Sequence, residues 1–503
     1  MTILSLYFFV FLLISLLLYY CIRPAQKYIL LLASLYFYVR ISPNSVPELI
    51  ALVAIYSIVT YGGGLLLEKL SGGWKKAVLV LCSLLLFGTL CVLKYAYNLA
   101  AAVSALFSFS ADFSFLKFGA FIGIAYFTFT AAGYLIDVYW GNCPAEKNPF
   151  DVVLFIFYFP QLISGPLTRY PEMHPRLSAK RKPDYEYISL GIRRMAWGYF
   201  KKLVISERFA VVVNTVFKNY PEYSFTGILI AACCYAVQLY TDFSGCMDII
   251  IGASNLFGVD LPENFNAPFL SETVQEFWQR WHITLGTWFK TYLMYPLQKS
   301  GFIQFFGRIA KARFGKKAGK KIPFYLSMIV LWGLIGLWHG GNGYYFVAVG
   351  AVPCFLLIFS DLLQPVSKSL VKTLRINTQC ASWKWVRRIR TFLLLCISWF
   401  IVCAGNLRTA GAMLGHALTR LWDYTPFAAA IEKVGLNPLD ILIMTLGVVI
   451  LYIADKCQYD GSTLFRRMNE QNLWVRILLI CLEILAILVY GAVGKSSFIY
   501  FEL

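Results

Sequence analysis

The chain has 503 residues, of which 59% are hydrophobic and only 14% are charged. Soluble domains carry roughly 25% charged residues, so this composition excludes an ordinary globular protein and predicts a polytopic membrane protein in contact with lipid. The formal net charge of +19 would suit nucleic-acid binding, but the basic residues lie in loops between apolar runs. Nucleic acid is therefore not an expected partner.

Taken in chain order, the apolar runs predict a helical bundle. The run at 27–39 is short, and 150–168 is broken by prolines and glycine, which predicts a re-entrant element buried in protein. We expect an all-α fold with roughly 10 to 13 membrane elements in a single domain, residues 1–503. Runs that approach the length of a membrane span lie at 3–20, 47–67, 77–97, 118–138, 224–242, 323–341, 343–361, 391–405, 438–455 and 474–494.

Charge in the loops predicts the orientation. Residues 308–321 and 362–390 each hold seven Lys or Arg and no acid, and 169–208 hold ten. The positive-inside rule places all three in the cytoplasm. Counting spans from them puts segment 406–437 and both chain ends outside, in a multi-pass protein of a cell membrane.

Cysteines and histidines do not form a metal signature. The thirteen cysteines are scattered, mostly within apolar runs, where they behave as small hydrophobes. His174 and His416 are expected to be solvated loop residues, and no metal site is predicted because ligand spacing for zinc is lacking.

The segment from Gln275 to Tyr295 has aromatic residues at helical spacing, with His282 beside the stripe. We expect a helix in which His282 shares a face with Trp278 and Leu285. Two interpretations stay open: an amphipathic helix at the lipid headgroups, or a functional histidine.

His339 lies inside an apolar run and precedes Gly340, Gly341, Asn342 and Gly343. Ionisable groups at membrane depth are rare and mark chemistry or transport. A buried histidine bonded to one carbonyl is the alternative, but the glycines disrupt the helix there and leave backbone groups that need partners or a wet cavity.

Asp242 ends the apolar run at 224–242, and a second acid, Asp248, lies six residues later. Asp242 is a candidate for chemistry, or alternatively a cap for the next helix. Gly245 and Gly252 are expected to permit close helix contact.

These residues support two classes of function. A neutral imidazole in apolar surroundings can take a proton from a hydroxyl, which lets that oxygen attack an acyl carbonyl. Acyl transfer therefore fits. A proton-coupled transporter is the alternative, because membrane histidines and broken helices also mark proton relays.

Longer motifs give a specific resemblance. The run FNAPFLSETVQEFWQRWHITLGTWFKTYLMYPL and the later GLWHGGN resemble the membrane-bound O-acyltransferase (MBOAT) superfamily. YFTFTAAGYLIDVYWG, FYFPQLISGPLTRY, YTDFSGCMDIIIG and the terminal FIYFEL resemble its bacterial branch, which contains the alginate O-acetyltransferase membrane subunit and the D-alanyl transfer protein of teichoic acids. The motif-dense core covers about 126–345.

The resemblance implies a bundle around a central funnel, with His339 catalytic and His282 its partner. We expect substrate contacts from Trp281, Arg280, Trp338, Asp242, Ser244 and Asn342. Expected partners are an acyl-CoA or acyl-carrier thioester such as acetyl-CoA, a cell-envelope polysaccharide, membrane lipids and a separate extracytoplasmic acyltransferase, with no bound cofactor. Lys290 and Thr291 stand where alginate-type members show Arg-Asp, which favours another glycan as acceptor. D-alanyl transfer to teichoic acids is the alternative within the family.

Overall fold

The computed structural model describes residues 1–42, 46–108, 112–113, 121–162, 164–340, 343–423, 427–492 and 498. These residues are helical or irregular, and their one β-type contact is an isolated antiparallel bridge between Phe265 and Trp281. The expected all-α fold is confirmed. The described residues group into two compact units, each with its own internal packing. The single domain expected for the whole chain stays a prediction.

The first unit comprises residues 1–196 and 247–262. Its first two helices meet at an angle of 110°, and the segment expected to re-enter is divided between two short helices on either side of Tyr158. The helices are α1 (Leu6–Cys21), α2 (Gln26–Ile41), α3 (Val46–Lys69), α4 (Gly72–Leu106), α5 (Ile124–Trp140), α6 (Pro149–Phe157), α7 (Phe159–Leu162), α8 (Tyr170–Ser178) and most of α9 (Tyr185–Tyr199), with a 3₁₀ turn at Arg23–Ala25.

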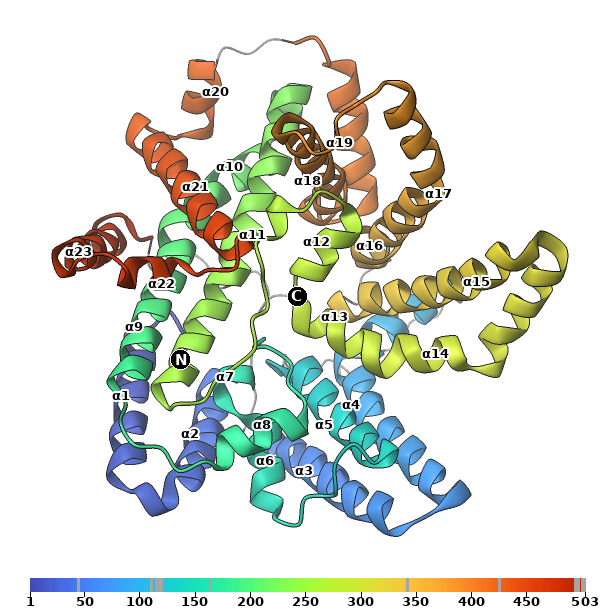
Figure 1. The fold of residues 1–503 in the computed structure, drawn as a ribbon, viewed down its shortest axis with the longest axis vertical. Helices are drawn as coiled ribbons and strands as arrows, with labels where there is room; N and C mark the ends of the chain where they lie inside the picture. Colours follow the sequence, from blue (N-terminus) through green and yellow to red (C-terminus); the bar gives the residue numbers. More distant parts are fainter. Residues whose placement is uncertain are drawn as a thin grey trace. The chain divides into compact units, whose positions relative to one another are not determined.

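The second unit comprises residues 197–246 and 263–503. It holds α10 (Glu207–Lys218), α12 (Val274–Arg280), α13 (Ile283–Phe289), α14 (Tyr295–Lys299), α15 (Gly301–His339), α16 (Gly343–Tyr345), α17 (Val352–Thr373), α18 (Ala381–Cys403), α19 (Leu407–Thr419), α20 (Phe427–Val434), α21 (Pro438–Tyr459), α22 (Leu464–Asn469) and α23 (Leu473–Tyr490) (Figure 1). Helix α11 (Phe225–Leu256) contributes to both units. Short 3₁₀ turns lie at Tyr220–Glu222 and Pro268–Leu270, and π-helical segments lie at Phe200–Ser206, Lys290–Met294 and Phe346–Ala351.

Seven helices among the described residues are long and apolar enough to cross a membrane, or eight if the bent pair α1–α2 forms one span. The protein is therefore a multi-pass membrane protein. The larger range of membrane elements expected from the sequence stays a prediction, because several expected runs form shorter or charged helices: α5 has 17 residues, and α18 begins with a basic stretch.

Glycines on α11 allow close helix packing, as expected. A Cβ at Gly252 would lie 2.7 Å from the carbonyl oxygen of Gly191 and 2.9 Å from the backbone nitrogen of Met195, both on α9. In the second unit, a Cβ at Gly245 would lie 2.9 Å from the carbonyl oxygen of Gly198. Real Cβ contacts of this length are forbidden by sterics, so side chains larger than glycine would push the helices apart.

We therefore expect Gly252→Ala to lower the free energy of unfolding by about 1–3 kcal/mol, the usual cost of overpacking. Gly62→Ala on α3 is the matched control, because nothing lies within 4 Å of its Cβ and alanine alone favours a helix. Thermal unfolding in detergent compares the two variants. Equal stability of both would contradict the close contact between α9 and α11.

Candidate active site

A short extended segment fixes the entry to α13. The backbone nitrogen of Asn266 donates to the carbonyl of Arg280 at 3.0 Å, and that of Ile283 donates to the carbonyl of Asn264 at 3.0 Å. Gln458 of α21 braces the same segment: its amide nitrogen donates to the carbonyl of Phe265, and its amide oxygen accepts from the nitrogen of Ala267. Residues 264–267 are thus hydrogen-bonded to Arg280 and Ile283 on one side and to Gln458 on the other.

This segment interrupts the helix expected over 275–295. Helix α12 ends at Arg280, and His282 adopts the left-handed backbone conformation, with φ 48° and ψ 52°, before α13 begins. Non-glycine residues adopt that conformation at a cost of about 1–3 kcal/mol, often at functional sites. The expectation that His282 shares one helical face with Trp278 and Leu285 is wrong, because backbone pairing with residues 264–266 replaces the helical bonds there.

His282 is buried, with 4% of its surface exposed. Its Nδ1 lies 3.1 Å from Oδ1 of Asn264, which also accepts from the backbone nitrogen of Thr284 at 3.1 Å and from the Thr284 hydroxyl at 2.9 Å. The ring of Phe243, on α11, meets the imidazole edge to face at 4.9 Å. These contacts hold the ring in one place.

His339 is the last residue of α15 and is also buried. Gly340 after it is extended and no longer helical, and a Cβ there would lie 2.2 Å from the ring of Tyr345. The helix break expected at the glycines is therefore present. Trp338 packs beside His339 and also against His282, with ring centroids 4.6 and 6.4 Å apart.

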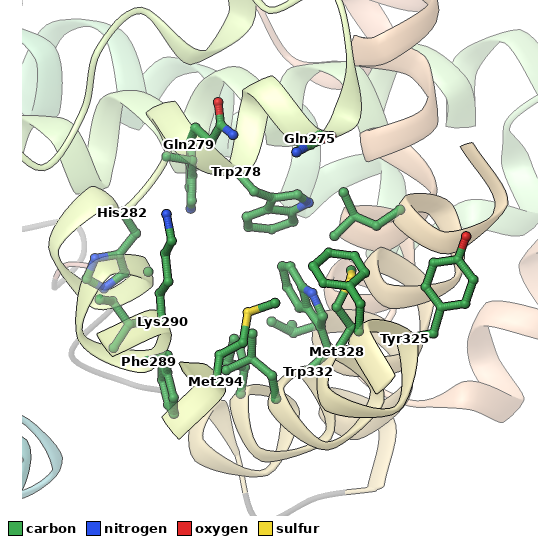
Figure 2. Close-up of a pocket in the computed structure, with 18 of the residues that line it drawn as sticks. Gln275, Trp278, Gln279, His282, Phe289, Lys290, Met294, Tyr325, Met328 and Trp332 are labelled. Carbon is green, nitrogen blue, oxygen red and sulfur yellow. The ribbon is translucent and has the colours of Figure 1, made fainter. Parts of the chain in front are cut away.

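Both histidines line one cavity of about 350 Å³. Figure 2 shows its labelled side chains around an open space: Trp278 and Gln279 come from α12, His282 lies before α13, and Trp332 comes from α15. The cavity also extends along α15 to Tyr325. Because 14 residues separate Tyr325 from His339, it follows the helix for about 21 Å.

Burial favours the neutral form of His282 in the cavity. His282 lies outside the candidate membrane spans, and burial, with a smaller contribution from His339, holds its pKa well below the usual value for histidine. The acid among the described lining residues is Asp361, which forms an ion pair with Lys321 and accepts from Tyr325 at the far end. An uncharged imidazole is a proton acceptor, so the inner cavity is suited to base catalysis.

The expected contact residues divide into two groups. Trp281 lines the cavity, and the ring of Trp338 contacts both imidazoles. Arg280 does not line it: the guanidinium pairs with Glu276 at 3.0 Å, donates to the carbonyl of Asn266 and lies over the ring of Tyr459. The structure thus gives Arg280 a bracing position at the end of α12.

Asp242 and Ser244 flank Phe243 on α11 but lie away from the cavity. Asp242 is fully buried and pairs with Lys202 at 2.6 Å, and Ser244 accepts from Lys201 at 2.9 Å. Asp242 lies within α11 and does not cap another helix. Asn342 lies outside the described residues, so its expected contact stays a prediction.

The other two histidines are not loop residues, which corrects the sequence-based expectation. His174 is on α8 and stacks on Tyr170, and its Nε2 lies 3.5 Å from Glu146 and 3.6 Å from Asp151. Lys27 pairs with the same Asp151 at 2.9 Å. His416 is on α19, with Nε2 3.2 Å from the carbonyl of Tyr223.

Sequence reasoning missed Asn264, Phe243 and Trp278 as site residues. Asn264 acts on His282 across 18 positions of sequence, and no helical or strand periodicity relates the two. From its spacing, Trp278 was expected only to belong to an aromatic stripe. In the structure its buried indole N–H has no hydrogen-bond acceptor among the described residues. Its place on the cavity wall makes it a donor for a bound molecule.

Comparison with known proteins shows which family the chain resembles. Residues 144–307 match the model of the MBOAT, membrane-bound O-acyltransferase family, which confirms the resemblance in the motifs. That match includes His282 and ends before His339.

The chain is also similar to curated proteins. It is 34% identical to the probable alginate O-acetylase AlgI of Pseudomonas syringae pv. tomato over 58% of this chain and 51% of that protein. It is 28% identical to the peptidoglycan O-acetyltransferase of Helicobacter pylori over 76% and 74%. The teichoic acid D-alanyltransferase of Bacillus subtilis is 27% identical over 59% and 70%. The chain spans about half the length of the first alginate-type relatives it matches.

The lowered pKa of His282 predicts a pH dependence of stability. Below about pH 6.5 the unfolded chain takes up a proton that the folded ring does not, so stability contributed by the neutral ring is lost as the pH falls. We expect the wild type to lose up to about 1.4 kcal/mol of unfolding free energy per pH unit more than His282→Asn. Asparagine is the suitable replacement because it tolerates the left-handed conformation.

Unfolding of both proteins in detergent between about pH 5.5 and 8 measures this difference. Parallel pH profiles would show that His282 takes up a proton in the folded protein as readily as in the unfolded chain.

Proposed function

We propose that this chain, which matches the MBOAT family over residues 144–307, is an acyltransferase subunit. It takes an acyl group, acetyl, from a cytoplasmic thioester and moves it across the membrane for O-acylation of an extracytoplasmic cell-envelope polysaccharide. The observation that carries the proposal is that His282 and His339, far apart in sequence, line one cavity. Relatives that acetylate alginate and peptidoglycan support the reaction class.

The reaction needs a base and a place for the thioester carbonyl. His339 takes the proton of the acceptor hydroxyl as its oxygen attacks the acyl carbon, and the C–S bond then breaks. The thiolate leaves and the proton on His339 passes to it, so the products are the ester and the free thiol. No covalent bond to the protein is required.

Two other groups assist in this scheme. His282 is a second polar group within the site, and its position is fixed by Asn264 and Phe243. The indole N–H of Trp278 is a hydrogen-bond donor on the cavity wall, suited to an acyl oxygen on which negative charge develops.

The charges of the cavity favour acetyl over D-alanyl. A D-alanyl group carries an ammonium, which in an apolar site needs a carboxylate partner. The acid among the described lining residues, Asp361, pairs with Lys321 and lies near Tyr325, at the end of the cavity away from His339. A D-alanyl thioester is the alternative donor, because the chain is also similar to D-alanyltransferases.

The proposed direction of transfer follows from loop charge. The basic segments 308–321, 362–390 and 169–208 are assigned to the cytoplasm, and 406–437 and both termini to the outside. The donor is then acetyl-CoA or an acyl-carrier thioester that approaches from the cytoplasm. The acceptor is glycan, reached through a separate extracytoplasmic acyltransferase.

The first test of this proposal concerns the general base. His339→Ala should lower the rate of acyl transfer by about 10²–10⁴-fold, the usual contribution of a general base, and should leave the protein folded. His416→Ala is the matched control, because that imidazole lies on α19 and does not line the cavity. Labelled acyl transfer by the purified variants measures both. Near wild-type transfer by folded His339→Ala would remove His339 from the mechanism.

The second test concerns the donor and its side. Inverted membrane vesicles expose the cytoplasmic face, so they should release free thiol from added acetyl-CoA, whereas sealed right-side-out vesicles should not. The release should need no proton gradient and should exceed that from a D-alanyl thioester. Gradient-driven solute uptake without thioester consumption would favour the proton-coupled transporter, and thiol release in right-side-out vesicles would reverse the proposed orientation.

A further inference from the structure

We propose that Asn264 is a positioning residue that holds His282 as the neutral tautomer with its proton on Nδ1, so that His282 meets the substrate through Nε2 as a hydrogen-bond acceptor. This inference rests on the proposed function for the identity of the substrate. It assigns a role to a residue that lies 18 positions before the histidine.

The tautomer follows from the partners of one oxygen atom. Oδ1 of Asn264 lies 3.1 Å from the backbone nitrogen of Thr284. A backbone N–H can only donate, so the atom facing it must be the amide oxygen and not the amide nitrogen. The same oxygen lies 3.1 Å from Nδ1 of His282. An amide oxygen can only accept, so Nδ1 carries the hydrogen.

A neutral imidazole has one N–H, so the lone pair is then on Nε2. The ring is 4% exposed and lines the cavity, where a charged imidazolium is disfavoured by burial. In this state His282 can accept a hydrogen bond from a substrate hydroxyl other than the one that His339 deprotonates. It cannot donate from Nε2 to the acyl oxygen, so that interaction falls to a donor such as the indole N–H of Trp278.

Asn264 also fixes where the ring is. Its carbonyl accepts from the nitrogen of Ile283, and its side chain accepts from the nitrogen of Thr284, so it satisfies two of the first N–H groups of α13 from outside the helix. His282, the residue before α13, has no side-chain cap bond of its own. One asparagine therefore sets the left-handed backbone, the ring position and the tautomer together.

The neutral state of His282 can be tested through the pH dependence of activity, for which the groups around the ring matter. Helix α11 presents Phe243, α15 presents Trp338 and His339, and the π-helical segment Lys290–Met294 contributes Lys290 to the cavity wall. A carboxylate in place of Asn264 would be an anion directly bonded to Nδ1–H.

The experiment compares Asn264→Asp with Asn264→Ala. Aspartate keeps an oxygen acceptor for Thr284 and His282 but stabilises the imidazolium, so the acid limb of kcat/KM for acyl transfer should move up by about one pH unit or more, with activity recovered at high pH. Alanine removes the acceptor and should lower kcat/KM by about 10²-fold at every pH, because the ring is no longer held. Thr284→Val, which removes one donor to Asn264 and leaves the bond to His282, is the matched control and should stay within a few-fold of wild type.

A second measurement does not depend on activity. The chain has four histidines, so ¹⁵N-histidine labelling gives few imidazole signals, and His282→Asn identifies those of His282. We expect a protonated Nδ1 and an unprotonated Nε2 in the wild type and in Thr284→Val, and a change of tautomer in Asn264→Ala.

The outcomes separate this inference from the proposed function. A wild type that transfers no acyl group but shows the Nδ1–H tautomer would sink the proposed function alone. Protonated Nε2 in the wild type would overturn the inference, as would an unmoved acid limb in Asn264→Asp or full activity in folded Asn264→Ala. If Asn264→Ala does not fold, the pH profile of Asn264→Asp and the wild-type spectrum decide.

Discussion

The site depends on one backbone constraint, the pairing of residues 264–266 with 280–283. That pairing breaks what would be a continuous helix, and it places His282 in the left-handed conformation with its ring buried. The strain of this backbone is offset by hydrogen bonds from Asn264 and by the brace from Gln458, so the chain is held in an arrangement that local propensity does not favour.

A second feature of the site is that the buried polar groups on α11 bond to partners away from the two histidines. On α11, Phe243 contacts His282, while its neighbours Asp242 and Ser244 bond to Lys202 and Lys201 elsewhere in the unit. Lys202 also pairs with Glu207 at 2.7 Å. Buried ions are costly unless paired. Their pairing away from the cavity leaves Lys290 and Asp361 as the lysine and acid among its described lining residues, while burial keeps His282 neutral.

The sequence predicted the all-α membrane fold, the helix break after His339, and the close contacts at Gly245 and Gly252. These follow from local properties: apolar length, glycine runs and small residues on a helix. It also placed His282 and His339 in one site, but through family resemblance and not through spacing. The prediction of one helix over 275–295 was wrong. The aromatic spacing continues through this segment, but backbone pairing with residues 264–266 breaks the helix.

Long-range contacts explain most of what could not be predicted. Asn264 follows no motif that relates it to His282, and Asp242 looks like a site residue in sequence because its partner Lys202 lies 40 positions away. Likewise, Arg280 was expected to contact the substrate, whereas Glu276, the carbonyl of Asn266 and the ring of Tyr459 surround it in the fold. Charge and spacing identify candidates, and only the fold shows which of them face the cavity.

The most direct test of the account is an experimental structure with a non-hydrolysable acetyl-thioester analogue, for example a thioether that carries a ketone in place of the thioester carbonyl. We expect the analogue to lie along α15 in the cavity, with its carbonyl carbon beside His339 and within reach of His282. An analogue bound outside this cavity, or one whose carbonyl lies far from both imidazoles, would contradict the claim that the two histidines form one acyl-transfer site.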